Sequence, residues 1–116
     1  LRHLYTAIKA SSSLPLPLDE LLGKLHPTPA VAGNPKAEAL ELISQLEQYD
    51  RSYYTGYFGL KNSDAGHFWV NLRCAQIISP IQICLYAGGG IIAASEPQSE
   101  WQETKNKMQT ILNVMQ

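Results

Sequence analysis

The 116-residue sequence has few charged residues and no excess of positive charge. Only 16% of its residues are charged, and the formal net charge is -1. Proteins that bind nucleic acid through its phosphates need a surplus of lysine and arginine, because neutralising the phosphates releases condensed counterions. The composition therefore argues against nucleic acid as a partner.

Long apolar runs are also missing. No stretch approaches the roughly 20 apolar residues that a membrane-spanning helix needs, and no charged-then-apolar leader with a small-residue cleavage site opens the chain. These absences predict a protein that is not bound to a membrane and is located in the cytoplasm. The first residue is Leu1 rather than methionine, so we expect further sequence upstream.

Cysteine and histidine are scarce. Cys74 and Cys84 could face each other across a hairpin, but a protein without an export signal usually keeps such thiols free and buried. His26 lies in a proline-rich stretch with no second histidine or cysteine at metal-ligand spacing, which argues against a zinc site. No serine or cysteine is framed by a nucleophile elbow, so hydrolytic triads are excluded as well.

Proline, serine and glycine interrupt the first third of the chain. A short helix within residues 1–10 is possible, but a serine run and two prolines follow it and predict an irregular lead-in. Residues 18–25 have a helical pattern, and the prolines and glycine of 26–35 predict a loop without regular structure. A helix over about 35–48 follows, with Asn34 as its N-cap.

The middle of the chain is rich in aromatic and β-branched residues separated by turn signals. From Tyr53 onward we predict three or four antiparallel strands. Within 67–74 the side chains should alternate between two faces, which places Arg73 on the less apolar face. Another strand, over 81–86, leads into the glycine run 88–90.

A final helix is predicted over about 97–115, and Ser95 and Gln98 have the spacing of a capping box at its start. Its apolar residues fall on one stripe at 3.6 residues per turn. We expect the helix to bury that stripe, which consists of Trp101, Met108, Ile111, Leu112 and Met115.

Two glutamates and a lysine stand at the edge of this stripe. Glu100 and Glu103 share one helix face, and Lys107 follows one turn later. Carboxylates in this arrangement suit Mg2+, which commonly takes one or two protein carboxylates plus water and substrate. The spacing also has an ordinary explanation, because acidic residues near a helix N-terminus favour its dipole and Glu103 and Lys107 form a standard i,i+4 pair.

The glycine run and Arg73 suggest a site for a small carboxylate. The run lacks the pattern of a P-loop or dinucleotide fingerprint, which argues against phosphate binding. Gly88 and Gly90 could let a carboxylate approach the backbone where a side chain would block it, and Arg73 could clamp it through two parallel hydrogen bonds. A tight strand connection and a structural ion pair are the alternatives.

Four segments stand out by their order and spacing: LHPTPA at 25–30, DRSYYTG at 50–56, NLRCA at 71–75, and YAGGGI at 86–91 running to SEP at 95–97 and EWQET at 100–104. Taken together they resemble the family of chorismate-binding enzymes, which includes anthranilate, aminodeoxychorismate, salicylate and isochorismate synthases. The HPTPA and LRCA stretches resemble isochorismate synthases more than the amine-forming members. Ser52, where the family usually has glycine, and Gly89, where it usually has alanine, depart from the pattern.

The resemblance implies an α/β (α+β) fold in which antiparallel β-sheet carries helices packed outside. Residues 25–116 would be the C-terminal part of the chorismate-binding domain, and 1–24 an irregular or helical lead-in. Part of such a fold would expose apolar sheet surface. We therefore expect association with the missing N-terminal part of the same enzyme, or poor solubility.

The implied function is that of an isomerase of the isochorismate synthase type, which interconverts chorismate and isochorismate with Mg2+. Glu103 would bind Mg2+ directly and Glu100 through a water. The residues implied to contact the substrate are Tyr54 and Arg73 at the enolpyruvyl group, Gly88, Gly90 and Lys107 at a carboxylate, and Ala30 at the pocket for the incoming nucleophile.

The catalytic residues themselves stay unknown. No lysine in the sequence matches the family's base motif, so the general base, the general acid and another magnesium-binding glutamate are expected upstream, and the chain alone should be inactive. Another chorismate-utilising enzyme, or a non-catalytic binding domain on the same scaffold, is the alternative. Both menaquinone and siderophore biosynthesis are compatible with the activity.

Overall fold

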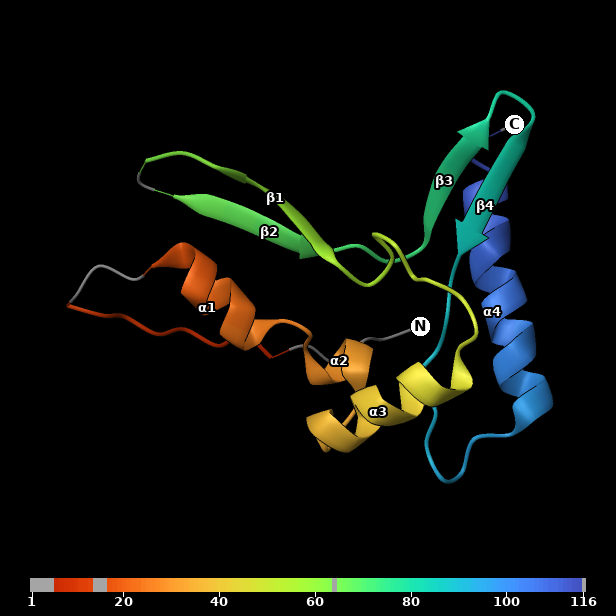
Figure 1. Cartoon of the computed structure of the whole chain (residues 1–116), viewed down its shortest axis with the longest axis horizontal. Coiled ribbons are helices and arrows are strands. Elements are labelled where there is room, and N and C mark those ends of the chain that lie inside the picture. The colour runs from red at the N-terminus through yellow and green to blue at the C-terminus, as the bar shows by residue number, and fades with distance from the viewer. Residues whose placement is uncertain (1–5, 14–16, 64, 116) are drawn as a thin grey trace.

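A computed structural model describes residues 6–13, 17–63 and 65–115 (Figure 1). Within these residues the order of elements is α1, α2, α3, β1, β2, β3, β4 and α4, which confirms a mixed fold of helices and antiparallel strands. The possible helix within residues 1–10 lies partly outside the described residues, and 6–13 contain no regular element. No helix in the described part of the chain is both long and apolar enough to cross a membrane.

Helix α1 spans Leu18–Leu25, as predicted. Its charges favour the helix dipole, since Asp19 and Glu20 lie in the first turn and Lys24 in the last. Lys24 also pairs with Glu20 at 2.6 Å on the exposed face.

A second helix, α2, spans Pro29–Ala32, so the prediction that 26–35 would lack regular structure is wrong. Proline at the first helical position is pre-organised for a helix and lacks only an N–H that would have no partner inside the helix there. Helix α3, Lys36–Leu46, begins one residue later than predicted, because Pro35 rather than Asn34 occupies the N-cap. The two helices pack closely, and Ala32, the last residue of α2, is 5% exposed.

The four strands form two separate antiparallel hairpins. Strands β1 (Tyr57–Lys61) and β2 (Gly66–Val70) pair in one sheet, and β3 (Cys74–Ser79) and β4 (Gln82–Tyr86) pair in another. Figure 1 shows the hairpins pointing in different directions from the segment that joins them. The prediction of three or four antiparallel strands is confirmed.

The predicted strand over 67–74 is interrupted, and Arg73 does not lie on a strand face. Strand β2 ends at Val70, and Arg73 has a φ of 47°, the left-handed conformation in which a strand cannot continue. Asn71 still pairs with the other strand's side of the hairpin, since its amide nitrogen donates to the carbonyl of Gly56 at 2.8 Å and its side chain to that of Tyr53 at 2.9 Å. Strand alternation in the sequence does not predict the left-handed conformation of Arg73, which the strand does not reach.

Cys74 and Cys84 are free thiols, as predicted, and both are half-buried rather than buried. Each has another partner across the hairpin, since Cys74 lies opposite Tyr86 and Cys84 opposite Gln76. The register therefore does not place the two thiols directly opposite one another.

Helix α4 spans Pro97–Leu112 and lies along β4 (Figure 1). It ends three residues before the predicted end. The predicted capping box is wrong: Glu96 occupies the N-cap without a side-chain cap, and the hydroxyl of Ser95 donates to the Glu100 carboxylate instead.

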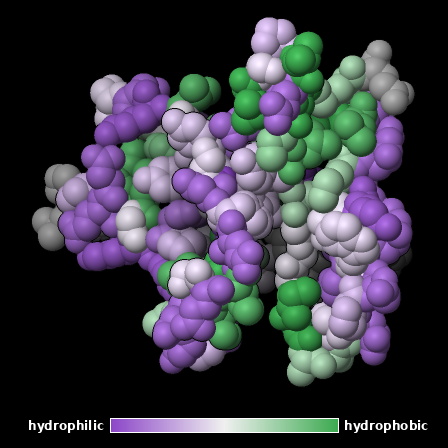
Figure 2. All heavy atoms as spheres, turned by 45° about the vertical axis from the view of Figure 1, so that its right-hand side comes forward, coloured by the Kyte–Doolittle hydropathy of each residue, from purple (hydrophilic) through white to green (hydrophobic). Residues whose placement is uncertain are grey.

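The apolar stripe of α4 is not buried. Trp101 is 57% exposed and Met115 47% exposed, and no residue of α4 is fully buried. A two-stranded hairpin is too narrow to cover a helix of this length, so only Ala32 and Tyr54 form a buried apolar core in the described residues. Figure 2 shows hydrophobic side chains gathered on the surface of the face in view. Apolar surface of this extent is typical of interaction sites, ligand-binding grooves or aggregation-prone regions.

Candidate functional site

The glycine loop after β4 meets the first half of α4, and three charged side chains converge on it. A Cβ atom added at Gly89 would lie 3.3 Å from Oε2 of Glu100, 3.8 Å from Oε1 of Glu103 and 3.9 Å from Nζ of Lys107. Residues three and four apart share one helix face, so α4 presents this group as a unit. The absence of a side chain at Gly89 leaves the main chain open to these groups.

Lys107 ties the helix to the loop. Its Nζ atom donates to the carbonyl oxygen of Gly88 at 2.9 Å and pairs with Oε1 of Glu103 at 2.5 Å. The hydrogen bond and charge of Lys107 lower the pKa of the Glu103 carboxyl, and the charge of Arg73 lowers it further. Arg73 therefore contributes positive potential to this site although it does not lie on a strand.

Glu100 is held by a neutral group. The hydroxyl of Ser95 donates to Oε1 of Glu100 at 2.6 Å, and the same hydroxyl oxygen accepts from the amide of Ile92 at 3.1 Å. Because Oε1 is engaged, Oε2 is the oxygen that faces Gly89. The two carboxylates of the site are thus anchored differently, one by a hydroxyl and one by an ammonium group.

Tyr54 also approaches this loop, next to Gly88. It is 9% exposed, and a Cβ atom added at Gly88 would lie 2.8 Å from its hydroxyl oxygen. Its ring stacks on that of Tyr86 with centroids 5.6 Å apart. Burial raises the pKa of the Tyr54 hydroxyl, so this group is neutral near pH 7 and can donate a hydrogen bond.

Arg51 fixes the turn that carries Tyr54. Its guanidinium binds both carboxylate oxygens of Glu47 and donates to Oγ1 of Thr55 at 3.2 Å, while its Cζ lies 5.9 Å from the Tyr54 ring centroid. Thr55 has a φ of 64°, which is uncommon for a β-branched residue. A strained backbone conformation persists where surrounding contacts hold it in place. Here the contacts of Arg51 with Thr55 and Tyr54 do so.

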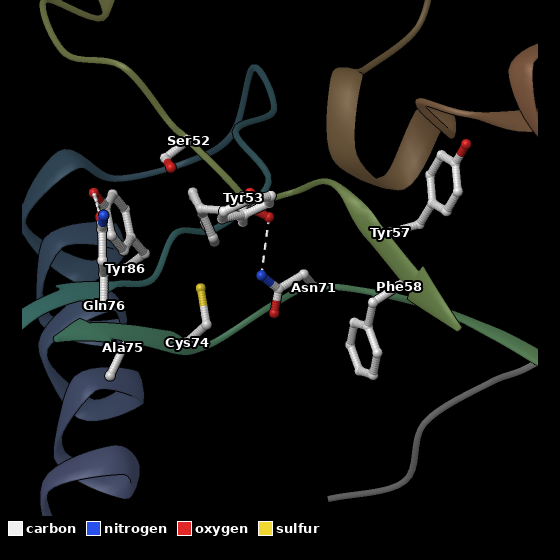
Figure 3. A pocket seen from close by; sticks show the side chains of 10 residues that line it. Ser52, Tyr53, Tyr57, Phe58, Asn71, Cys74, Ala75, Gln76 and Tyr86 are labelled. Carbon is white, nitrogen blue, oxygen red and sulfur yellow. Dashed lines mark hydrogen bonds between the residues drawn. The ribbon is translucent and has the colours of Figure 1, made fainter. Parts of the chain in front are cut away.

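Two hollows border these groups: one includes Tyr54 in its lining and the other includes Gly89. One has a volume of about 410 Å³ and lies at the junction of the two hairpins. Figure 3 shows Tyr86 and Gln76 on one side of it and Tyr57 and Phe58 on the other. It is lined by Ser52, Tyr53, Tyr54, Tyr57, Phe58, Asn71, Cys74, Ala75, Gln76 and Tyr86.

The second hollow, of about 440 Å³, lies at the start of α4. Its lining includes Gly89, Ser95, Glu100, Trp101 and Thr104. Glu100 therefore borders a space large enough for a small molecule, while Tyr54 borders the first hollow.

The structure brings most of the predicted site residues together. Glu100, Glu103 and Lys107 converge at the loop with Tyr54 and Gly88, and Arg73 acts on Glu103 through its charge. Gly90 has open space where its Cβ would be. Ala30 is exposed on α2, which packs on α3, so its predicted place beside the substrate stays a prediction.

Gly89 and Ser95 are the residues of this site that the sequence prediction missed. In the sequence Gly89 is a departure from the family pattern, and the spacing of Ser95 and Gln98 predicts a helix cap. A serine five residues before a glutamate, with a turn between them, is the signal that could have indicated a side-chain hydrogen bond instead.

Glu100 and Glu103 could supply part of the coordination shell of a hard cation such as Mg2+. Glu100 and Glu103 supply carboxylate oxygens on one face of α4, as Mg2+ prefers. In the described ranges no three His, Cys, Asp or Glu side chains gather as metal ligands. Two carboxylates are enough for Mg2+ only where water, substrate or other protein groups complete its octahedral shell.

A family model and several curated proteins match this chain, and all of them are chorismate-binding enzymes or isochorismate synthases. The family model described as "Chorismate binding enzyme" matches residues 1–116. The chain is 43% identical over 112 residues to the vibriobactin-specific isochorismate synthase of Vibrio cholerae, which is 95% of this chain and 28% of that protein. It is 41% identical over 115 residues to isochorismate synthase DhbC of Bacillus subtilis, covering 97% of the chain and 29% of the relative.

A third relative, isochorismate synthase EntC of Escherichia coli K12, is 44% identical over 91 residues, or 78% of this chain and 23% of that protein. The chain thus spans less than a third of the length of each of these relatives.

Proposed function

The chain belongs to the family of chorismate-binding enzymes, and on this premise we propose that it is part of an isochorismate synthase, an isomerase that interconverts chorismate and isochorismate with Mg2+. The observation that carries the proposal is the convergence of Glu100, Glu103 and Lys107 on Gly89. The names of the three relatives support the choice of this activity within the family.

The site offers the groups that a small dicarboxylate needs. Lys107 has three ammonium donors, of which the Gly88 carbonyl and Glu103 engage two, so one remains for a substrate carboxylate. Arg73 adds a second positive charge near Glu103. We propose that the amides of Gly88 and Gly90 contact the same carboxylate as Lys107, and that Arg73 and the neutral hydroxyl of Tyr54 contact the enolpyruvyl group.

Glu103 would hold Mg2+ directly, and Glu100 would hold it through a water. Bound there, Mg2+ would supply Lewis-acid polarisation of the substrate's ring carboxylate. The chain's own contribution is to keep two carboxylates on one helix face and to hold the loop carbonyl of Gly88 against Lys107. Both features fix the site before substrate binds, which lowers the cost of ordering it.

The reaction adds water at ring C2 of chorismate while the C4 hydroxyl departs, so it needs a general base and a general acid. We propose that the remaining length of the polypeptide supplies both, together with another carboxylate for Mg2+. In this proposal residues 25–116 form the C-terminal part of the chorismate-binding domain of a cytoplasmic enzyme. Ala30 would line the pocket for the incoming water.

The test is an assay of the complete polypeptide that carries this chain, with chorismate and Mg2+, in which the product is identified by chromatography. Isochorismate supports the proposal. Salicylate or anthranilate would assign the chain to another activity of the same family, and no turnover of chorismate would contradict an enzymatic role.

A further inference from the structure

Ser95 lies two residues before α4, but its side chain does not cap that helix. Its Oγ atom lies 2.6 Å from Oε1 of Glu100 and donates to it. The hydroxyl of Ser95 therefore binds a carboxylate of the proposed cation site, that of Glu100, five residues further along the chain.

The position of this hydroxyl is fixed by a turn. The amide of Ile92 donates to Oγ of Ser95 at 3.1 Å, and the amide of Ser95 donates to the carbonyl of Ile92 at 2.9 Å. A hydroxyl has one donor and two acceptor lone pairs. Because an N–H occupies one lone pair, the hydroxyl proton is left to point at Glu100.

The hydrogen bond from Ser95 fixes the orientation of the Glu100 carboxylate. With Oε1 bound to Ser95, Oε2 faces the loop, 3.3 Å from where a Cβ of Gly89 would be. A carboxylate that is already oriented loses little rotational freedom when it takes part in cation binding, and groups that orient ligands commonly contribute 10- to 100-fold in metal affinity.

The groups that hold the two glutamates differ in charge. Lys107 holds Glu103 with a positive charge, which competes with a cation for the same carboxylate. Ser95 is neutral, so it orients Glu100 and leaves its negative charge for the cation. The two anchors are therefore not equivalent, although each engages one oxygen of a glutamate.

We propose that Ser95 is a positioning residue that orients the Glu100 carboxylate for cation binding. This inference rests on the proposed function, since it takes Glu100 and Glu103 as the Mg2+-binding pair. It concerns the affinity for the cation itself, so it can be measured without substrate.

The experiment is calorimetric titration of the complete polypeptide with Mg2+ alone. Ser95→Ala is expected to weaken Mg2+ binding by about 10- to 100-fold. Ser95→Thr, which keeps the hydroxyl, is expected to retain most of the wild-type affinity. The matched control is Ser44→Ala, which also removes a serine hydroxyl, because Oγ of Ser44 donates to the main-chain carbonyl of Glu41 at 2.7 Å on α3, outside the proposed site. That variant should bind Mg2+ like the wild type.

A double-mutant cycle separates positioning from a general loss of structure. In a Glu100→Gln background Ser95→Ala should cause no further loss of Mg2+ affinity, because its effect acts through the carboxylate. Equal losses in both backgrounds would overturn the inference, as would wild-type affinity in Ser95→Ala. Should Ser95→Ala fail to fold, Ser95→Cys serves instead, since the thiol has similar size but is a weak donor and should weaken binding.

The outcomes also distinguish this inference from the function on which it rests. If the wild type binds Mg2+, Glu100→Gln weakens binding and Ser95→Ala does not, only the role of Ser95 is wrong. If the wild type does not bind Mg2+, the proposed cation site is wrong and the role of Ser95 falls with it.

Discussion

The Nζ atom of Lys107 donates a hydrogen bond to the carbonyl oxygen of Gly88 at 2.9 Å, across 19 positions of sequence. This contact joins α4 to the loop after β4, and the same ammonium group pairs with Glu103. The side chain of Lys107 is 23% exposed, so the contact is partly screened from water. The Lys107 ammonium group thus contacts the loop and also lowers the pKa of a proposed metal ligand, Glu103.

Replacement of Lys107 by methionine should weaken substrate binding. Hydrogen bonds to charged groups contribute about 1.5–3 kcal/mol, so we expect the KM for chorismate to rise by about tenfold or more. The measurement is steady-state kinetics of the complete polypeptide. Lys105→Met is the matched control, because Lys105 lies near the exposed ring of Trp101 on the same helix. An unchanged KM in Lys107→Met would contradict the role assigned to it.

Gly88→Ala should disturb the position of Tyr54. The new Cβ would lie 2.8 Å from the Tyr54 hydroxyl oxygen, which is closer than real Cβ contacts, whereas the ring carbon behind it is 3.9 Å away. We therefore expect Gly88→Ala to lower Tm, and Tyr54→Phe in the same chain to recover most of the loss. Gly90→Ala is the control for Tm, since nothing lies within 4 Å of its added Cβ. Equal losses of Tm in both alanine variants would show that Tyr54 is not the cause.

Chelation of divalent cations should stop the reaction, and Mg2+ should restore it. Lewis-acid stabilisation contributes several kcal/mol to such a transition state, so Glu103→Gln should reduce kcat/KM by about a hundredfold or more. The initial rate at a series of Mg2+ concentrations measures this. A Glu103→Gln enzyme with normal rates at low Mg2+ would exclude Glu103 as a ligand.

The ion pair of Glu47 and Arg51 should make stability depend on pH in the acid range. The hydrogen bond from Arg51 is the main cause that lowers the pKa of Glu47 below its usual 4.5, against the effect of burial. A carboxyl with a lowered folded-state pKa contributes stability that is present above its unfolded pKa and is lost as pH falls through the folded one.

We therefore expect Tm to fall below about pH 4.5, and to fall less steeply in Glu47→Gln. Thermal unfolding between neutral and acid pH measures both curves. Glu41→Gln, an exposed change on the same helix, is the control and should follow the wild-type curve. Parallel curves for all three proteins would show that Glu47 does not contribute.

The isolated chain should associate or aggregate. Its described residues bury only Ala32 and Tyr54 among apolar side chains and leave Trp101, Ile77 and Phe58 more than half exposed. Such surface favours self-association in water. Sedimentation velocity across a range of concentrations tests this, and a monomer with cooperative unfolding would be the opposite result.

Local patterns in the sequence were sufficient to predict α1, α3, α4 and the presence of antiparallel strands. These elements depend on periodicity and on proline or glycine at their ends, which act within a few residues. The position of the acidic pair at the start of α4 was predictable for the same reason, because residues three apart share a helix face.

The predictions that were wrong concern features that local sequence patterns do not encode. The predicted strand over 67–74 ends at Val70, before Arg73 in its left-handed conformation, and Ser95 binds Glu100 instead of capping the helix. Hydrophobic periodicity encodes neither feature. The α4 stripe was correctly placed on one face, but its burial was wrong because burial depends on a surface that the hairpin of β3 and β4 is too narrow to supply.

Each sheet in the described part of the chain has only two strands, so every strand keeps one side without a backbone partner. Rows of N–H and C=O groups along such a side accept an extended segment by main-chain pairing, largely regardless of its side chains. Short extended peptides of matching length should therefore bind along these strands. Such binding would leave the loop at Gly88–Gly90 untouched.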